Sequence, residues 1–169
     1  MRIKKRWLLL LVLLLPATLT AQNQDEEVPR AEIGVFYEYQ RDVDSDLNLH
    51  GYGARFTVNA SRWLALETTL AIDPKRGAVP VRFIHQEFAG KLTYRRGRGG
   101  VFAFVGPGYT NASAFGFSDT RPTLKWGGGA EFYPKRHVGL RVDAGEIITF
   151  FPGGHTGNFF VQSGISFRF

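Results

Sequence analysis

Ionisable side chains recur at alternate positions along parts of the chain, and His85, Glu87 and Lys91 form one such set. Alternate residues of an extended strand point to one face, so an imidazole, a carboxylate and an amine could act there as general acid and base. The same pattern on other segments instead favours an internal network of ion pairs, in which each buried charge has a partner. We predict that this network comprises Arg55, Glu67, Glu87, Lys91, Lys125, Glu131, Arg141 and Asp143.

The remaining residues offer little for catalysis or for holding a cofactor. His50, His137 and His155 are scattered, without a carboxylate or a second histidine at ligand spacing, so no metal site is expected. No serine lies in a G-x-S-x-G setting. The stretches "GGGAEF" and "RRGRGG" complete neither a phosphate-binding loop nor a dinucleotide fingerprint, and the second is typical of a basic turn that places Arg95 at a membrane surface. We therefore predict no catalytic residues and no cofactor.

The first 21 residues have the form of an export signal. A basic stretch is followed by the apolar run 7–15 and then by small residues up to Ala21. Without residues 1–21, which hold four of the 21 basic residues and none of the 15 acidic ones, the formal charge falls from +6 to about +2, so no nucleic-acid partner is indicated. The chain has no cysteine, which excludes a disulfide scaffold. We predict a cleaved signal peptide over 1–21, a polar lead-in over 22–30 and one domain over 31–169.

The domain consists of short segments in which apolar and polar residues alternate, separated by turn residues, and no segment has helical periodicity. The strands are expected near 32–40, 51–59, 64–72, 84–94, 101–110, 124–132, 138–145 and 159–169. The connections alternate between short and longer, the longer ones including 73–82, 111–122 and 151–157. An open sheet of eight strands would leave two unpaired edges, so we predict an all-β, eight-stranded antiparallel up-and-down barrel.

Three features indicate that the apolar face of this barrel points outward, into lipid. The polar face is rich in glycine and carries both charge signs in near balance, as an enclosed interior requires. Aromatic residues at strand ends beside the short turns, Trp63, Tyr94 and Tyr133, predict a girdle at one membrane interface. The export signal is followed by no apolar segment long enough for a spanning helix. A transmembrane barrel satisfies all three.

The stretches "VFAFVGPGY", "LKWGGGAEFYPKRHVGLRVDAG" and "GISFRF" make residues 31–169 resemble the small eight-stranded outer-membrane barrels of Gram-negative bacteria, the OmpA-like and OmpX-like superfamily. The resemblance implies a transmembrane barrel in the cell outer membrane, without the peptidoglycan-binding domain of OmpA proteins. The alternating aromatic end, with Phe167 and the terminal Phe169, is similar to the signal that the outer-membrane assembly machinery reads on members of this family.

The expected function is that of a non-enzymatic integral outer-membrane protein with a structural, membrane-stabilising or surface-interaction role. An eight-stranded barrel has room inside only for its own side chains, so a general diffusion pore is not expected. The expected partners are membrane lipid, lipopolysaccharide and the assembly machinery, and the expected state is a monomer. Two alternatives remain: an enzyme acting on lipid A or phospholipid, for which His50 or His155 with Thr156 would lie at the rim, and a soluble lipocalin-like binder.

Overall fold

The computed structural model describes residues 29–42, 48–74 and 81–169. The predicted signal peptide and most of the lead-in lie outside this part of the chain. Within it, no helix is long and apolar enough to cross a membrane.

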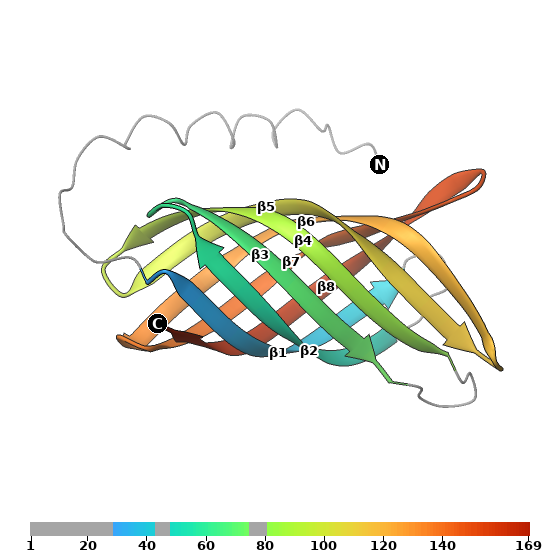
Figure 1. The fold of residues 1–169 in the computed structure, drawn as a ribbon, viewed down its shortest axis with the longest axis horizontal. Coiled ribbons are helices and arrows are strands. Elements are labelled where there is room, and N and C mark those ends of the chain that lie inside the picture. The colour runs from blue at the N-terminus through green and yellow to red at the C-terminus, as the bar shows by residue number, and fades with distance from the viewer. Residues whose placement is uncertain (1–28, 43–47, 75–80) are drawn as a thin grey trace, which may run out of the picture.

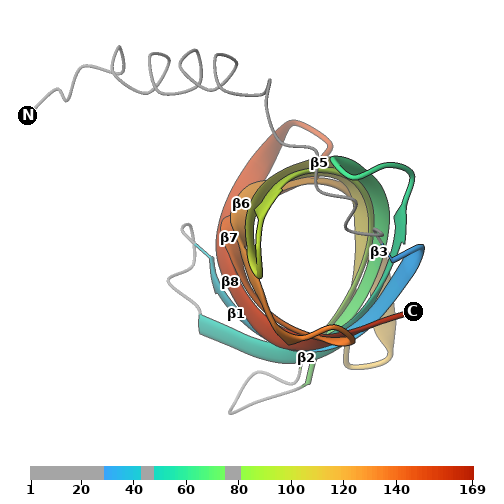
Figure 2. The same cartoon turned by 90° about the vertical axis from the view of Figure 1, so that its left-hand side faces the viewer.

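Eight antiparallel strands close into a single barrel in the order β1 to β8 (Figures 1 and 2), which confirms the predicted fold class. Their bounds are β1 Ala31–Asp42, β2 Asn48–Asn59, β3 Leu64–Asp73, β4 Arg82–Arg96, β5 Gly99–Ala114, β6 Phe117–Lys135, β7 Val138–Phe151 and β8 Gly154–Arg168. Because every strand has two hydrogen-bonded neighbours, the barrel has no free sheet edge.

The barrel closes where the last strand pairs with the first. Along this seam Val35 lies opposite Ile165 and Glu32 lies opposite Arg168. The ladder extends to the final residue, since the Phe169 amide donates to the Ala31 carbonyl at 3.1 Å and the Ala31 amide donates back at 3.2 Å. We call the end of the barrel that holds these two residues the terminal end, and the opposite end, which holds the tip between β5 and β6, the hairpin end.

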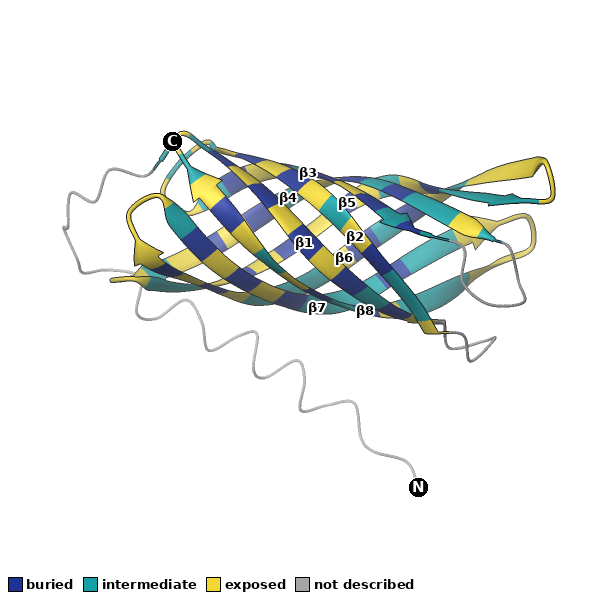
Figure 3. Ribbon diagram, turned by 90° about the horizontal axis from the view of Figure 1, so that it is seen from below, coloured by how far each residue is buried: buried dark blue, intermediate teal, exposed yellow. Residues whose placement is uncertain are grey.

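The two faces of the barrel differ as the alternation predicts. Figure 3 shows buried residues alternating with more exposed ones along the middle of the strands in view. Along the middle of the barrel, most charged and polar side chains point inward and are buried, whereas most large apolar side chains point outward and are exposed. The outward-facing set includes Ile33, Val35, Leu66, Leu70, Phe88, Leu92, Val101, Val105, Trp126, Phe132, Leu140, Val142, Ile165 and Phe167. A continuous apolar exterior of this kind is matched to lipid rather than to water.

The sequence predicts two long connections that the structure does not contain, and both predictions are wrong. Residues 111–122 do not form a loop, because β5 continues to Ala114 and β6 begins at Phe117. In the same way, residues 151–157 belong mainly to β7 and β8, which are joined by Pro152 and Gly153. The Asn, Ser, Asp, Gly and Pro residues of these stretches are typical of turns. Here backbone pairing across the hairpins, such as Ser113 opposite Ser118, outweighs that local preference.

Candidate functional site: the polar interior

Twelve ionisable residues and several amides meet inside the barrel, and they fall into three layers along its axis. The central layer is built around Arg141 of β7, whose guanidinium reaches Glu67 of β3 with two contacts, Nη1 to Oε2 at 2.5 Å and Nη2 to Oε1 at 3.0 Å. Its Nε also donates to Asp143 at 3.1 Å. Arg55 of β2 lies 3.3 Å from Asp143 and donates to the Gln162 side chain at 3.0 Å. Two cations and two carboxylates therefore balance in this layer.

A second layer lies toward the terminal end and is centred on two carboxylates. Glu131 of β6 accepts from Arg95 at 2.8 Å and lies 3.4 Å from the Lys91 ammonium. Glu32 of β1 lies 3.4 Å from both Arg95 and Arg168. The sequence placed Arg95 in a turn at the membrane surface, and that prediction is wrong. Arg95 falls at an inward position of β4, where its partners offset the cost of burying its charge.

The third layer lies toward the hairpin end. Lys125 of β6 donates to Glu87 at 2.7 Å and lies 3.8 Å from Glu38. The Glu38 carboxylate also accepts from the amides of Gln40, at 2.6 Å, and of Gln162. Because Gln162 also binds Arg55, its amide connects this layer to the central one. All five side chains are buried.

His85 does not join Lys91, although the two share a strand face. The imidazole instead lies between Asp73 of β3, with Nε2 2.8 Å from Oδ2, and Thr110 of β5, with Nδ1 2.7 Å from Oγ1. Register explains this placement, because His85 pairs directly with Ala71 and is therefore diagonal to Asp73. The sequence predicts Asp73 in the connection 73–82, and that prediction is wrong, because β3 continues to Asp73. Its alternation with Glu67 and Ala71 is the signal that could have placed it inside.

A carboxylate, an imidazole and a hydroxyl in one line resemble the arrangement that activates a serine nucleophile. In this chain the hydroxyl belongs to Thr110, which is buried in the interior along with both of its partners. A lipid substrate on the outer surface would not reach it. The line is therefore better described as a structural set of hydrogen bonds than as an active site.

Aromatic side chains inside the barrel are the main feature that the sequence did not predict. Phe102 and Phe104 of β5 point inward with Phe160 of β8, and together with Ile147 they form a small apolar cluster. The Arg141 guanidinium lies 4.2 Å from the centre of the Phe102 ring, and the Lys125 ammonium lies 4.4 Å from that of Phe160. An aromatic ring beside a cation fills interior space and also stabilises the positive charge.

The predicted aromatic girdle is only partly present. Trp63 and Tyr94 point outward and are about half exposed. Tyr133 does not belong to the girdle, because it is 7 % exposed and donates a hydrogen bond to Glu32 at 3.3 Å. Tyr133 lies two residues after the inward-facing Glu131 on β6, so it points to the same side of the strand. The alternation of the strand, and not the nearby turn, therefore decides where the Tyr133 side chain points.

The packed interior leaves little open space. The cavity between Glu67, Glu87, Lys125 and Asp143 measures about 10 Å³, about the room that one water molecule needs. The other histidines lie away from this interior set: His50 contacts the Tyr37 hydroxyl, His137 lies in the turn before β7, and His155 lies beside Phe150.

Comparisons with known proteins agree with this architecture. No curated protein shows significant sequence similarity to the chain. Among solved structures, the barrel is similar to the attachment invasion locus protein Ail of Yersinia pestis, with a TM-score of 0.58 and 16 % identity over 83 % of this chain and 99 % of Ail. The N-terminal β-barrel domain of Pseudomonas aeruginosa OprF matches with a TM-score of 0.61 and 11 % identity over 84 % of this chain and all of that domain (100 %). Neisserial surface protein A matches with a TM-score of 0.60 and 10 % identity over 82 % of this chain and 96 % of its own.

The sequence itself identifies the family. Residues 8–169 match the model of the outer membrane protein β-barrel domain, which covers the whole barrel. The closed eight-stranded fold, the apolar exterior and the charged interior are the features expected of a domain of this kind. The chain belongs to the outer membrane protein β-barrel domain family.

Proposed function

We propose that the protein is a non-enzymatic, monomeric barrel of the outer membrane that stabilises the membrane and presents its hairpin end at the cell surface. The observation that carries the proposal is the filled interior, in which pairs such as Arg141 with Glu67 occupy the axis and leave a cavity of about 10 Å³. A pore for general diffusion needs a continuous aqueous path, and an eight-stranded barrel packed in this way does not offer one.

The partners that fit the exterior are membrane lipid and lipopolysaccharide. The apolar side chains between Trp63 at one end and Tyr109 at the other are suited to acyl chains, with the two aromatic residues at the interfaces. The assembly machinery is the expected partner during insertion, through Phe167 and Phe169. Export through a cleaved signal peptide over 1–21 is part of the same proposal.

A surface-interaction role is supported by the hairpin end. The tip between β5 and β6 presents Phe115 and Phe117 with 77 % and 82 % of their surface exposed. Exposed aromatic side chains beyond the lipid-facing band are available for contact with another molecule. One of the structurally similar proteins, Ail, is known in complex with the heparin analogue sucrose octasulfate, with a TM-score of 0.52 to this chain.

The test of the closed interior is solute permeation through vesicles that contain the folded protein. We expect the release of a small sugar to match that of protein-free vesicles, and rapid release would contradict the proposal. The membrane-stabilising role is tested in cells that lack the gene, which should take up more of an apolar dye. Both the wild-type chain and the Phe115→Ser/Phe117→Ser variant should restore the barrier, because the tip is not required for it.

A lipid-modifying enzyme is the alternative function, and the contacts from Asp73 through His85 to Thr110 are its candidate catalytic set although all three side chains are buried. Mass spectrometry of lipid A and phospholipid from cells with and without the protein distinguishes it. An unchanged lipid profile is expected. A modification that appears with the wild-type chain and disappears with Thr110→Val would establish the enzyme instead.

A further inference from the structure

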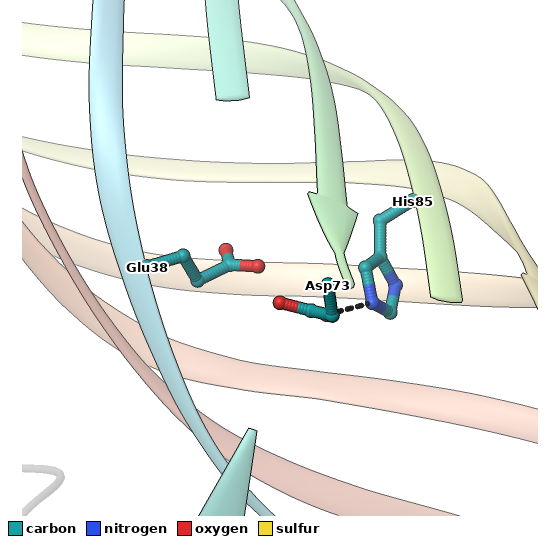
Figure 4. A group of neighbouring side chains, drawn as sticks. All are labelled: Glu38, Asp73 and His85. Carbon is teal, nitrogen blue, oxygen red and sulfur yellow. Dashed lines mark hydrogen bonds and ion pairs between the residues drawn. The ribbon is translucent and has the colours of Figure 1, made fainter. Parts of the chain in front are cut away.

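We propose that Glu38, Asp73 and His85 bind a divalent transition-metal ion of the zinc class inside the hairpin end of the barrel. Each residue offers one ligand atom, and these atoms all lie within 4.8 Å of one another. The three side chains come from β1, β3 and β4 and converge on one point (Figure 4). All three are buried, so a bound ion would be shielded from competing water.

The contact between His85 and Asp73 is the core of the site. Nε2 and Oδ2 lie 2.8 Å apart, and the other ring nitrogen contacts the Thr110 hydroxyl. In the metal-free protein a proton on Nε2 makes the hydrogen bond to Asp73, and Nδ1–H donates to Thr110. Loss of the Nε2 proton leaves a lone pair that faces the carboxylate. A metal ion between these two atoms replaces the proton of their hydrogen bond, which is released to solvent. Thr110 then acts as the outer partner that orients a ligating histidine.

Two buried oxygen atoms without hydrogen-bond partners give independent support. The second carboxylate oxygen of Asp73, Oδ1, accepts no hydrogen bond although the residue is 1 % exposed. Gln40, which contacts Glu38 through its amide nitrogen, has an unpartnered Oε1 and is 0 % exposed. A buried acceptor without a donor is costly, and a cation satisfies such oxygens directly. Gln40 is therefore the candidate for a fourth ligand.

A glycine between the two carboxylates allows them to approach each other. Gly51 of β2 pairs with Glu38 of β1, and β2 separates β1 from β3. A Cβ atom on Gly51 would lie 2.0 Å from Asp73 Oδ1, so any side chain there would occupy the place of this carboxylate. Figure 4 shows the Asp73 and Glu38 carboxylates directed toward one another.

The charges of the layer also favour a divalent cation. Its described ion pairs link Glu38 and Glu87 to one ammonium, Lys125, and link Asp73 to His85. The Lys125 ammonium lies closer to Glu87, at 2.7 Å, than to Glu38, at 3.8 Å. With His85 neutral, three carboxylates and one ammonium leave two negative charges, which one divalent ion offsets.

The donor set indicates which ion fits. One imidazole nitrogen with two or three oxygen atoms suits zinc and related first-row metals, whereas calcium and magnesium prefer ligands that are all oxygen. Zinc binds nitrogen and oxygen at about 2.0–2.2 Å, so ligand atoms in a tetrahedral shell lie about 3.5 Å apart. On binding, the Nε2–Oδ2 distance of 2.8 Å would widen slightly and the separations of up to 4.8 Å would shorten.

The test is calorimetric titration of the untagged protein, folded in detergent micelles and treated with a chelator, with zinc chloride alone. We expect one saturable site per chain and no comparable heat with calcium chloride. His85→Gln and Asp73→Asn should each weaken zinc binding at least ~10-fold. Absence of saturable zinc binding, or equal affinity for calcium, would overturn the proposal.

A second variant guards against misfolding and against binding to surface histidines. The triple substitution His50→Gln/His137→Gln/His155→Gln leaves His85 as the only imidazole of the chain, with its surroundings intact. This variant should bind zinc within about twofold of the wild type, since no ligand is removed. Loss of binding in the triple variant would show that the ion sits on the outer histidines and would refute the site, whatever the fate of His85→Gln.

Discussion

Arg141 holds Glu67 across the centre of the barrel through two parallel contacts, at 2.5 Å and 3.0 Å, with both side chains buried. Removing one partner of such a pair leaves an uncompensated charge in a low-dielectric interior. Arg141→Met should therefore lower the free energy of unfolding by about 3–5 kcal/mol, measured by denaturant titration in lipid vesicles.

The matched control for this substitution is Arg121→Met. Arg121 pairs with Asp119 at 2.7 Å, but both side chains are largely accessible, at 36 % and 59 %. Exposed pairs contribute about 0–1 kcal/mol, so the free energy of unfolding of this variant should be close to that of the wild type. Equal effects of the two substitutions would mean that the interior pair is as solvated as the surface pair.

Gly106 is required by a close approach between strands. A Cβ atom at this position would lie 1.8 Å from the Phe88 carbonyl oxygen and 2.5 Å from the Ala89 Cα, and neither backbone atom can move without displacing β4. Gly106→Ala should cost about 1–3 kcal/mol in the same unfolding measurement. Gly90→Ala is the control, because its nearest neighbour would lie at 4.0 Å. A stable Gly106→Ala barrel would show that β4 and β5 are less closely packed than described.

The terminal phenylalanine should matter for assembly. Phe169 is 65 % exposed, yet its backbone completes the seam with Ala31. We expect Phe169→Asp, or deletion of the residue, to lower the amount of heat-modifiable barrel in the outer-membrane fraction. Phe117→Asp changes an aromatic at the opposite end that is 82 % exposed, and this variant should assemble normally. Normal levels of both Phe169 variants would remove the assembly role.

The sequence predicts the fold well because the signal is repeated. Period-two alternation in seven of the eight segments indicates which face is buried, and balanced charges at inward positions such as Lys91 and Asp143 indicate an enclosed interior. The same rule would have placed Tyr133 and Arg95 inside, where turn residues nearby suggested the surface.

Contacts across the barrel were less predictable, because they depend on strand register and on shape. Asp73 meets His85 only through the diagonal set by the pairing of β3 with β4. Phe102 and Phe104 lie in a segment that is apolar on both faces, so alternation does not say which side is interior. Their contacts with the Arg141 guanidinium depend on how the strands come together when the barrel closes, which the sequence pattern does not specify.

The most direct test of the account is the environment of Val35, which is 61 % exposed on the apolar face of β1. The chain has no native cysteine, so a nitroxide on Val35→Cys reports from one position, and one on Phe117→Cys reports from the hairpin tip. In lipid vesicles, we predict that the label at position 35 collides often with oxygen and rarely with a water-soluble nickel complex, with the reverse at position 117. Frequent nickel collisions at position 35 would place this face in water and contradict the transmembrane barrel.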